Sequence, residues 1–257
     1  MTTVHLIGGG WDPAAAPALY GPFLEAAGAS PTVATVVLDE GEGPGDGRAG
    51  FARWAEVLRR TRPCEPVPVL VPLGGRLDVA ALGDADALFV CGGLTPGYAD
   101  ALAPAADAIR SWLTHGERPY AGSSAGAAVA AGRALVGGWK DGDVPVCPDD
   151  AGEDLDEVTV VPGLGLVPWT VDVHCAQWGT LPRLATAVAR DGLRGLALDE
   201  NTALHLTADG ARVAGSGTAW SVRPDGGGVA LTAHRSGAFL PAEEAGGAAR
   251  VSGADRR

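Results

Sequence analysis

Short, continuous runs of apolar residues alternate with stretches of helical spacing along the first half of the chain. The apolar runs predict buried strands at 4–7, 32–38, 67–71, 87–91 and 119–121. Helical patterns fall between them, at 14–27, 50–60 and 96–115. Because strands buried on both faces and separated by helices are typical of parallel sheets, the pattern predicts an α/β fold with a doubly wound, mainly parallel sheet.

The second half of the chain has a different pattern. Asp, Gly and Pro crowd residues 141–156, which we interpret as an irregular excursion because strand and helix patterns resume after it. These later elements are predicted at 158–161 (strand), 181–190 (helix) and 195–198 (strand). From Thr202 onward, Gly or Asp-Gly turns separate short apolar segments, which predicts C-terminal β-hairpins. We therefore expect one α/β domain over residues 1–241 and a disordered tail over 242–257.

Composition narrows the classes of partner. The 257 residues carry a formal net charge of −12, which argues against nucleic acid and anionic membranes. We see no secretory signal at the N-terminus and no apolar run approaching the ~20 residues of a membrane span. The four cysteines are widely scattered, which disfavours both a zinc site and a disulfide framework. We expect a soluble, cytoplasmic protein that binds a small substrate, and leave a homodimer open.

One segment carries a nucleophile motif. Residues 122–126, Gly-Ser-Ser-Ala-Gly, fit G-x-S-x-G and stand between a predicted strand and an alanine-rich helix. A serine on such a sharp turn needs small neighbours, and the N–H groups at the start of the helix favour negative charge on an attacked carbonyl. Ser124 is therefore the candidate nucleophile. The alternative is a Gly/Ala-rich helix start with Ser123 as its N-cap.

A serine nucleophile needs a base and an acid that orients it. Five histidines are available: His5 within the first strand, His115 at a helix end, His205 on a strand where it would face solvent, His234 in a late hairpin, and His174 after a strand-like run. We favour His174 from its position. For the acid we favour Glu200, which follows the predicted strand at 195–198, with Asp199, Asp172 and Asp143 as alternatives.

Three segments together resemble a known family. In chain order they are Gly-Ser-Ser-Ala-Gly-Ala at 122–127, Asp-Val-His at 172–174 with Arg183 following, and Gly-Leu-Ala-Leu-Asp-Glu-Asn-Thr-Ala-Leu at 195–204. They resemble the dipeptidase E and cyanophycinase family of serine peptidases, which has a class I glutamine amidotransferase-like fold. The resemblance implies that Ser124 is the nucleophile and His174 the general base. Glu200 matches the acid of the cyanophycinase branch, and Asp143 resembles that of the dipeptidase branch.

The resemblance also implies how a substrate is held. Gly93 and Ala125 would supply the backbone N–H groups that bind the oxyanion, and Leu94, Thr95, Trp178 and Arg183 would contact the substrate. The implied substrate is a small peptide or amide with an aspartyl or β-aspartyl residue, cleaved without metal or cofactor. Leu94 replaces the usual asparagine of dipeptidases, and Trp178 stands where the family tends to have arginines. These departures put the preference for acidic substrates in doubt.

Two other functions fit parts of the sequence. An α/β-hydrolase esterase would use Ser124, Asp199 and His234, in the order of that fold. A catalytically inactive member of the same fold would only bind its ligand. A third possibility, dinucleotide binding at Gly8-Gly9-Gly10, is disfavoured because Pro13 occupies the place of the last required glycine. A close backbone approach beside the site, or a plain tight turn, fits these glycines better.

Overall fold

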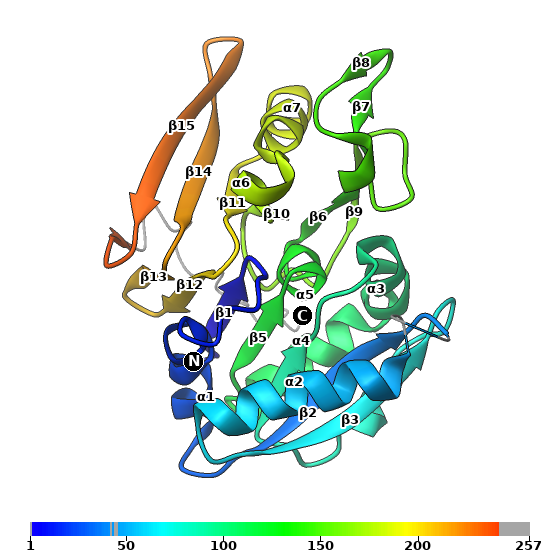
Figure 1. Cartoon of the computed structure of the whole chain (residues 1–257), viewed down its shortest axis with the longest axis vertical. Helices are drawn as coiled ribbons and strands as arrows, with labels where there is room; N and C mark the ends of the chain where they lie inside the picture. The colour runs from blue at the N-terminus through cyan, green and yellow to red at the C-terminus, as the bar shows by residue number, and fades with distance from the viewer. Residues whose placement is uncertain (1, 42, 44–45, 242–257) are drawn as a thin grey trace, which may run out of the picture.

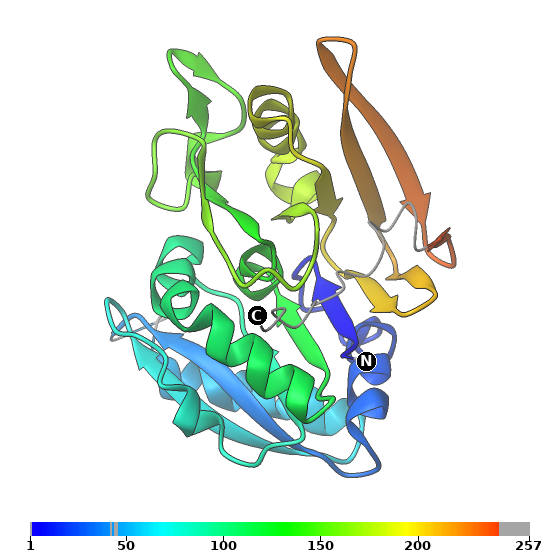
Figure 2. The same cartoon turned by 180° about the vertical axis from the view of Figure 1, so that it is seen from behind.

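A large sheet of eight strands runs through the lower part of the molecule in Figures 1 and 2. In spatial order its strands are β16 (Phe239–Pro241), β13 (Gly210–Gly215), β12 (Thr202–Thr207), β1 (Val4–Ile7), β5 (Tyr120–Ser123), β4 (Ala87–Val90), β2 (Thr32–Asp39) and β3 (Glu65–Pro72). The strands from β1 to β3 are parallel, and β12, β13 and β16 add antiparallel pairs at one edge. The structure, a computed structural model, describes residues 2–41, 43 and 46–241.

Helices cover both faces of this sheet. They are α1 (Ala16–Ala27), α2 (Gly47–Thr61), α3 (Thr95–Leu102) and α4 (Ala106–His115), with 3-10 turns at Val79–Leu82 and Ala103–Ala105. α2 lies in front of β2 and β3 in Figure 1, and α4 lies on the opposite face, seen in Figure 2. β1, β5 and β4 are buried along their whole length, which fits their mainly apolar or small residues.

A second, four-stranded sheet lies above the first in Figure 1. Its order is β10 (Thr170–Val173), β11 (Gly195–Leu198), β14 (Thr218–Asp225) and β15 (Gly228–Arg235), and only β10 and β11 are parallel. Two helices, α6 (Cys175–Trp178) and α7 (Leu181–Asp191), connect β10 to β11. Because parallel strands end at the same edge, the residues after β10 and β11 are brought together.

The short α5 (Ala125–Val129) leads from the large sheet into an irregular excursion. The excursion contains the pair β6 (Arg133–Gly137) and β9 (Thr159–Pro162), the small hairpin β7 (Lys140–Asp141) and β8 (Val144–Pro145), and a 3-10 turn at Asp149–Ala151. Backbone hydrogen bonds within the excursion hold its parts together. The Gly138 N–H donates to the Gly152 carbonyl, for example, and the Trp139 N–H donates to the Asp156 carbonyl.

The mainly parallel α/β fold with C-terminal hairpins confirms the prediction from the apolar pattern. The single helix expected at 96–115 was wrong: it is broken into α3, a 3-10 turn and α4, with Pro104, which has no N–H to donate, in the break. The strands β6 and β14 were not foreseen. The single domain over 1–241 stays a prediction, and the expected tail at 242–257 lies outside the described residues.

His5 and His205 form a buried pair between β1 and β12. Their Nδ1 atoms are 2.9 Å apart, and the His205 Nε2 lies 2.9 Å from the Ala18 carbonyl of α1. Burial lowers the pKa of His5 to about 3, with His205 contributing, and burial also lowers the pKa of His205. His5 is structural, as expected, but the expectation that His205 faces solvent was wrong. Both rings are buried against α1, where His5 lies beside Phe23 and His205 is bonded to Ala18.

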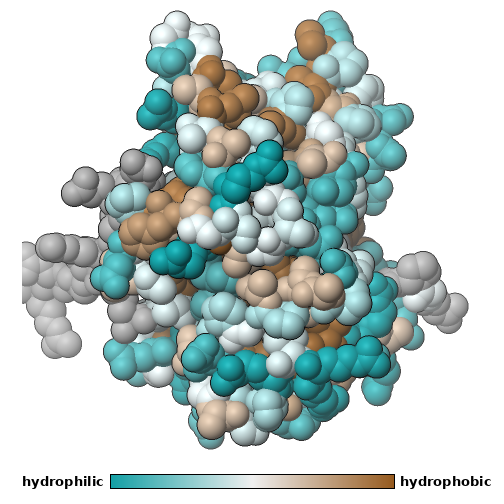
Figure 3. All heavy atoms as spheres, turned by 60° about the vertical axis from the view of Figure 1, so that its left-hand side comes forward, coloured by the Kyte–Doolittle hydropathy of each residue, from teal (hydrophilic) through white to brown (hydrophobic). Residues whose placement is uncertain are grey.

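The surface shown in Figure 3 is mainly hydrophilic, with hydrophobic residues in separate patches. Across residues 2–41, 43 and 46–241, no helix is both long and apolar enough to cross a membrane.

Candidate active site

Ser124 stands on a strained turn between β5 and α5. Its φ of 54° and ψ of −115° are unusual for a residue with a side chain, and such dihedrals cost about 1–3 kcal/mol. The turn is fixed by a bond from the Ser124 N–H to the Ile7 carbonyl of β1, 2.9 Å long. Gly126 packs so closely on β4 that a Cβ there would lie 2.2 Å from the Val90 carbonyl oxygen. The small residues of the motif therefore serve this close packing.

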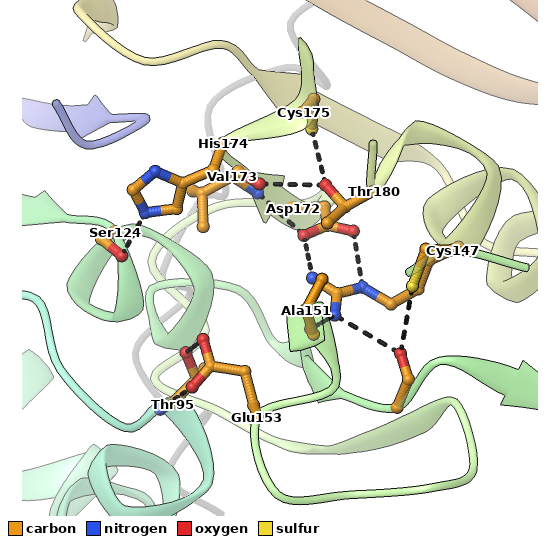
Figure 4. Close-up of polar contacts among 12 residues, drawn as sticks. Thr95, Ser124, Cys147, Ala151, Glu153, Asp172, Val173, His174, Cys175 and Thr180 are labelled. Atoms are coloured by element: carbon orange, nitrogen blue, oxygen red, sulfur yellow. Dashed lines mark hydrogen bonds and ion pairs between the residues drawn. The ribbon is translucent and has the colours of Figure 1, made fainter. Parts of the chain in front are cut away.

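His174 reaches Ser124 from the end of β10. Its Nε2 lies 2.8 Å from the Ser124 Oγ (Figure 4). The residue has a left-handed backbone, with φ 54° and ψ 30°, and its N–H donates to the Gly8 carbonyl. A Cβ on Gly9 would lie 2.1 Å from the His174 Cε1, so only glycine leaves room for the ring. The glycines after β1 therefore provide the close backbone approach that the sequence suggested.

Glu200 completes a chain of hydrogen bonds. Its Oε1 lies 2.8 Å from the His174 Nδ1, and its N–H donates to the Gln177 Oε1. It follows β11, whose parallel pairing with β10 places the two residues side by side. Asp143 instead lies exposed in the turn between β7 and β8, and the His174 ring nitrogen it would need is taken by Glu200. The geometry favours Glu200 over Asp143.

The environment of His174 keeps its ring neutral at pH 7. Burial lowers the pKa of His174 below its ordinary 6.5, and the hydrogen bond and charge of Glu200 oppose this in part. Trp178 stacks on the ring, with centroids 4.1 Å apart and planes 9° from parallel. A neutral imidazole whose Nδ1 is bonded to a carboxylate presents its Nε2 as a proton acceptor, which is what a serine needs.

The loop between β4 and α3 runs beside Ser124. A Cβ on Gly92 would lie 3.1 Å from the Ser124 Cβ, so this backbone is in direct contact with the serine. Two of the next three residues are held by carboxylates: the Leu94 N–H donates to Glu40, and the Thr95 N–H and hydroxyl both donate to Glu153. We call residues 92–95 the oxyanion loop, because it includes the expected oxyanion donor Gly93.

A cavity of about 730 Å³ opens in front of Ser124 and His174. Its walls include four tryptophans, Trp11, Trp54, Trp139 and Trp178, and six carboxylates, Glu40, Asp149, Asp150, Glu153, Asp154 and Asp156. Leu94, an expected substrate contact, and Gly93, the expected oxyanion donor, also line it. Of the described residues that form the wall, none is Lys or Arg. The cavity therefore combines aromatic faces with an excess of carboxylates, of which Asp156 is paired with Lys140.

Arg183, expected to bind substrate, is placed elsewhere. It is buried, its Nε and Nη2 pair with both carboxylate oxygens of Asp172, and its Nη1 donates to the Ala151 and Gly138 carbonyls. Because these bonds use the guanidinium inside the protein, Arg183 is not available to the substrate, and the expectation that it binds substrate was wrong. Thr95 is likewise buried, and its hydroxyl and N–H are both used by Glu153.

Replacing Arg183 with leucine is expected to destabilise the fold by about 3–5 kcal/mol, because it leaves the Asp172 carboxylate buried without its cation. Urea unfolding measures the change in free energy. The control is Arg59→Leu, which removes an exposed pair with Glu65 and should cost no more than about 1 kcal/mol. Equal stability losses in the two variants would contradict the structural role of Arg183.

The residues of the esterase alternative do not come together. The Asp199 carboxylate accepts from the N–H groups of Ala176 and Thr218, and His234 on β15 is bonded to the Ser221 hydroxyl. The Ser124 hydroxyl is bonded to His174 instead. The rival triad of Ser124, Asp199 and His234 is therefore not formed.

Sequence reasoning missed several residues of the cavity wall, among them Trp11, Glu40 and Glu153. Trp11 directly follows the glycines after β1, and Glu40 directly follows β2, so both stand at carboxyl ends of parallel strands, where sites of α/β proteins lie. That rule could have identified them. Glu153 lies in the irregular excursion, where no pattern in the sequence distinguishes it from its acidic neighbours.

Comparison with known proteins decides the family. The sequence model of peptidase family S51 matches residues 76–214, which is more than half of the chain. The chain belongs to peptidase family S51. The match includes Ser124, His174 and Glu200, and membership makes this protein a serine-type peptidase.

Relatives of this S51 peptidase extend the match over most of the chain. Two cyanophycinases, from Trichormus variabilis and a Nostoc species, are each 29% identical to it over 236 residues, covering 87% of this chain and 74% of theirs. A peptidase from an acI-B1 Actinobacterium shares the fold with a TM-score of 0.63 and 19% identity, over 94% of this chain and 97% of that one. A peptidase E candidate from Listeria monocytogenes EGD-e shares the fold with a TM-score of 0.52 and 15% identity, over 84% of this chain and 98% of that one.

Proposed function

We propose that this S51 peptidase hydrolyses a small peptide or amide through an acyl-enzyme on Ser124. The observation that carries the proposal is the chain of hydrogen bonds from the Ser124 hydroxyl through both ring nitrogens of His174 to Glu200. A serine beside a neutral imidazole that a carboxylate orients is the arrangement that activates serine nucleophiles. The Ser124 hydroxyl, at one end of this series of hydrogen bonds, lines the cavity, where a substrate carbonyl can reach it.

The reaction proceeds in two halves. Ser124 Oγ attacks the amide carbonyl carbon while His174 Nε2 accepts the hydroxyl proton, and Glu200 stabilises the imidazolium. The N–H groups of Gly93 and Ala125 hold the oxyanion, each contributing on the order of 10²–10³-fold to kcat. His174 then protonates the leaving amine as the C–N bond breaks, which leaves an ester on Ser124. In the second half, His174 accepts a proton from water as the water oxygen attacks the ester carbonyl. His174 then returns that proton to the Ser124 Oγ as the C–O bond breaks, which releases the acid and restores the free serine.

The charge of the cavity wall sets the substrate preference. An aspartyl or β-aspartyl dipeptide is the substrate class that the family resemblance suggests. The six carboxylates in the wall repel further negative groups and attract cationic ones, and the tryptophan faces can stack on a cation. We therefore favour a β-aspartyl dipeptide whose second residue is basic.

We expect the kcat/KM for β-aspartyl-lysine to exceed that for β-aspartyl-glutamate by about tenfold or more. The reason is the negative potential of the wall, so the ratio should shrink as salt screens it. Release of free aspartate, measured at low and high ionic strength, gives both quantities. Faster cleavage of the glutamate dipeptide would contradict the proposed preference without affecting the proposed chemistry.

The chemistry itself has a separate test. Hydrolysis of any aspartyl dipeptide that is lost in Ser124→Ala supports an acyl-enzyme on this residue. A binding protein without catalytic activity would instead cleave none of the aspartyl dipeptides tested. It would bind them equally well with and without the Ser124 hydroxyl.

A further inference from the structure

Glu153 makes two hydrogen bonds to the oxyanion loop. Its Oε2 accepts the Thr95 N–H and its Oε1 accepts the Thr95 hydroxyl, both at 3.0 Å (Figure 4). Thr95 is the first residue of α3 and stands two positions after Gly93. A carboxylate that accepts from a backbone N–H and a side chain of the same residue fixes both the position and the rotation of that residue.

The segment that carries Glu153 is anchored on its other side to the strand that leads to His174. The Ala151 carbonyl accepts a 2.6 Å bond from Arg183, whose guanidinium forms the buried pair with Asp172. The Asp172 Oδ1 also accepts the Val173 N–H, one residue before His174. Residues 151–153 thus contact the oxyanion loop directly through Glu153, and Ala151 is linked through Arg183 to Asp172, two residues before His174 (Figure 4).

The backbone around Glu153 is held in an unfavourable conformation. Glu153 and Asp154 have φ values of 56° and 60°, in the left-handed region that residues with a Cβ seldom adopt. Such residues persist only where surrounding contacts hold them, and they concentrate at functional sites. Here the turn directs the Glu153 carboxylate at Thr95 while Ala151 stays bound to Arg183.

We propose that Glu153 is a positioning residue that holds the oxyanion loop against the catalytic serine, so that the Gly93 N–H points at the developing oxyanion. The proposal rests on the proposed function. Glu153 acts through Thr95 and the loop backbone. It stabilises the transition state, in which the oxyanion has formed, and does not strengthen the binding of the substrate. Displacement of a positioned group by about 1 Å can cost on the order of 10²-fold in rate.

We expect Glu153→Ala to lower kcat on the best-cleaved aspartyl dipeptide by about 10- to 100-fold, with KM changed less than about twofold. Labelling of Ser124 by a fluorophosphonate should slow by a similar factor. Because Thr95 is the only link invoked, Thr95→Val should lose part of the same kcat, Thr95→Ser should restore it, and Glu153→Ala combined with Thr95→Val should lose no more than Glu153→Ala alone.

The matched control is Glu157→Ala. Glu157 lies on the same excursion and also accepts a backbone N–H, that of Gly142, but it lies outside the cavity wall, so this variant should keep the wild-type kcat. A wild-type kcat in folded Glu153→Ala, or a raised KM at constant kcat, overturns the inference. If Glu153→Ala does not fold, equal kcat values for Thr95→Val and the wild type overturn it. Failure of the wild type to be labelled at Ser124 would instead overturn the proposed function.

Discussion

Replacing Ser124 with alanine is expected to lower kcat/KM by about 10⁶-fold, and His174→Ala by a similar factor. The two losses should be equal, and the double variant should lose no more than either single one, because the serine and its base act as one unit through their 2.8 Å hydrogen bond. Initial rates of dipeptide hydrolysis measure the effect. A low residual rate is expected from the oxyanion N–H groups and substrate binding alone.

The control for this prediction is His234→Ala. His234 is bonded to Ser221 on β14 and takes no part in the hydrogen-bond chain of Ser124, so the variant should keep the wild-type rate. Activity that survives His174→Ala and disappears in His234→Ala would contradict the assignment of the base and favour the esterase-like arrangement.

The second large effect is expected for Glu200→Gln, with a loss of about 10⁴-fold in kcat at pH 7. The amide keeps the size of the side chain but removes the charge that stabilises the imidazolium, and its NH₂ group can turn the ring to the wrong tautomer. Asp143→Asn should leave the rate unchanged, since Asp143 lies exposed in the β7–β8 turn. The opposite result for these two variants would make Asp143 the acid.

The pH dependence gives Glu200→Gln a second readout. His174 must be neutral to accept a proton, so activity is present above its pKa and is lost as the pH falls through it. Burial lowers that pKa below 6.5, and Glu200 raises it. The wild-type kcat/KM should therefore be level from pH 7 upward and fall on the acid side, and the residual activity of Glu200→Gln should fall at a lower pH. If the acid-side fall in activity of Glu200→Gln moved to higher pH instead, the assigned contact between Glu200 and His174 would be contradicted.

Most of the fold could be predicted because its signals are local. β1, β4 and β5 are buried along their whole length, so their sequences are mainly apolar or small and can be identified without knowledge of the tertiary structure. The excursion could not be predicted, because its conformation depends on contacts with distant residues. The Arg183 bond to Ala151, for example, joins positions that are 32 residues apart.

The candidate triad was predictable for a related reason. Ser124 and His174 directly follow strands and Glu200 stands two residues after one, where residues from different parts of the chain meet. Substrate contacts were less predictable, because a sequence does not show which charges are already paired. Arg183 looked available to a substrate until the structure placed its guanidinium on Asp172. The negative cavity wall depends likewise on how β2 and the excursion come together in space.

The most direct measurement is mass spectrometry of the protein after reaction with a fluorophosphonate probe. The account predicts a single covalent adduct on the peptide that contains Ser124, no adduct in Ser124→Ala, and much slower labelling in His174→Ala. Hydrolysis of an aspartyl dipeptide by wild-type protein that carries no adduct at Ser124, or an adduct on another residue that abolishes the activity, would contradict it.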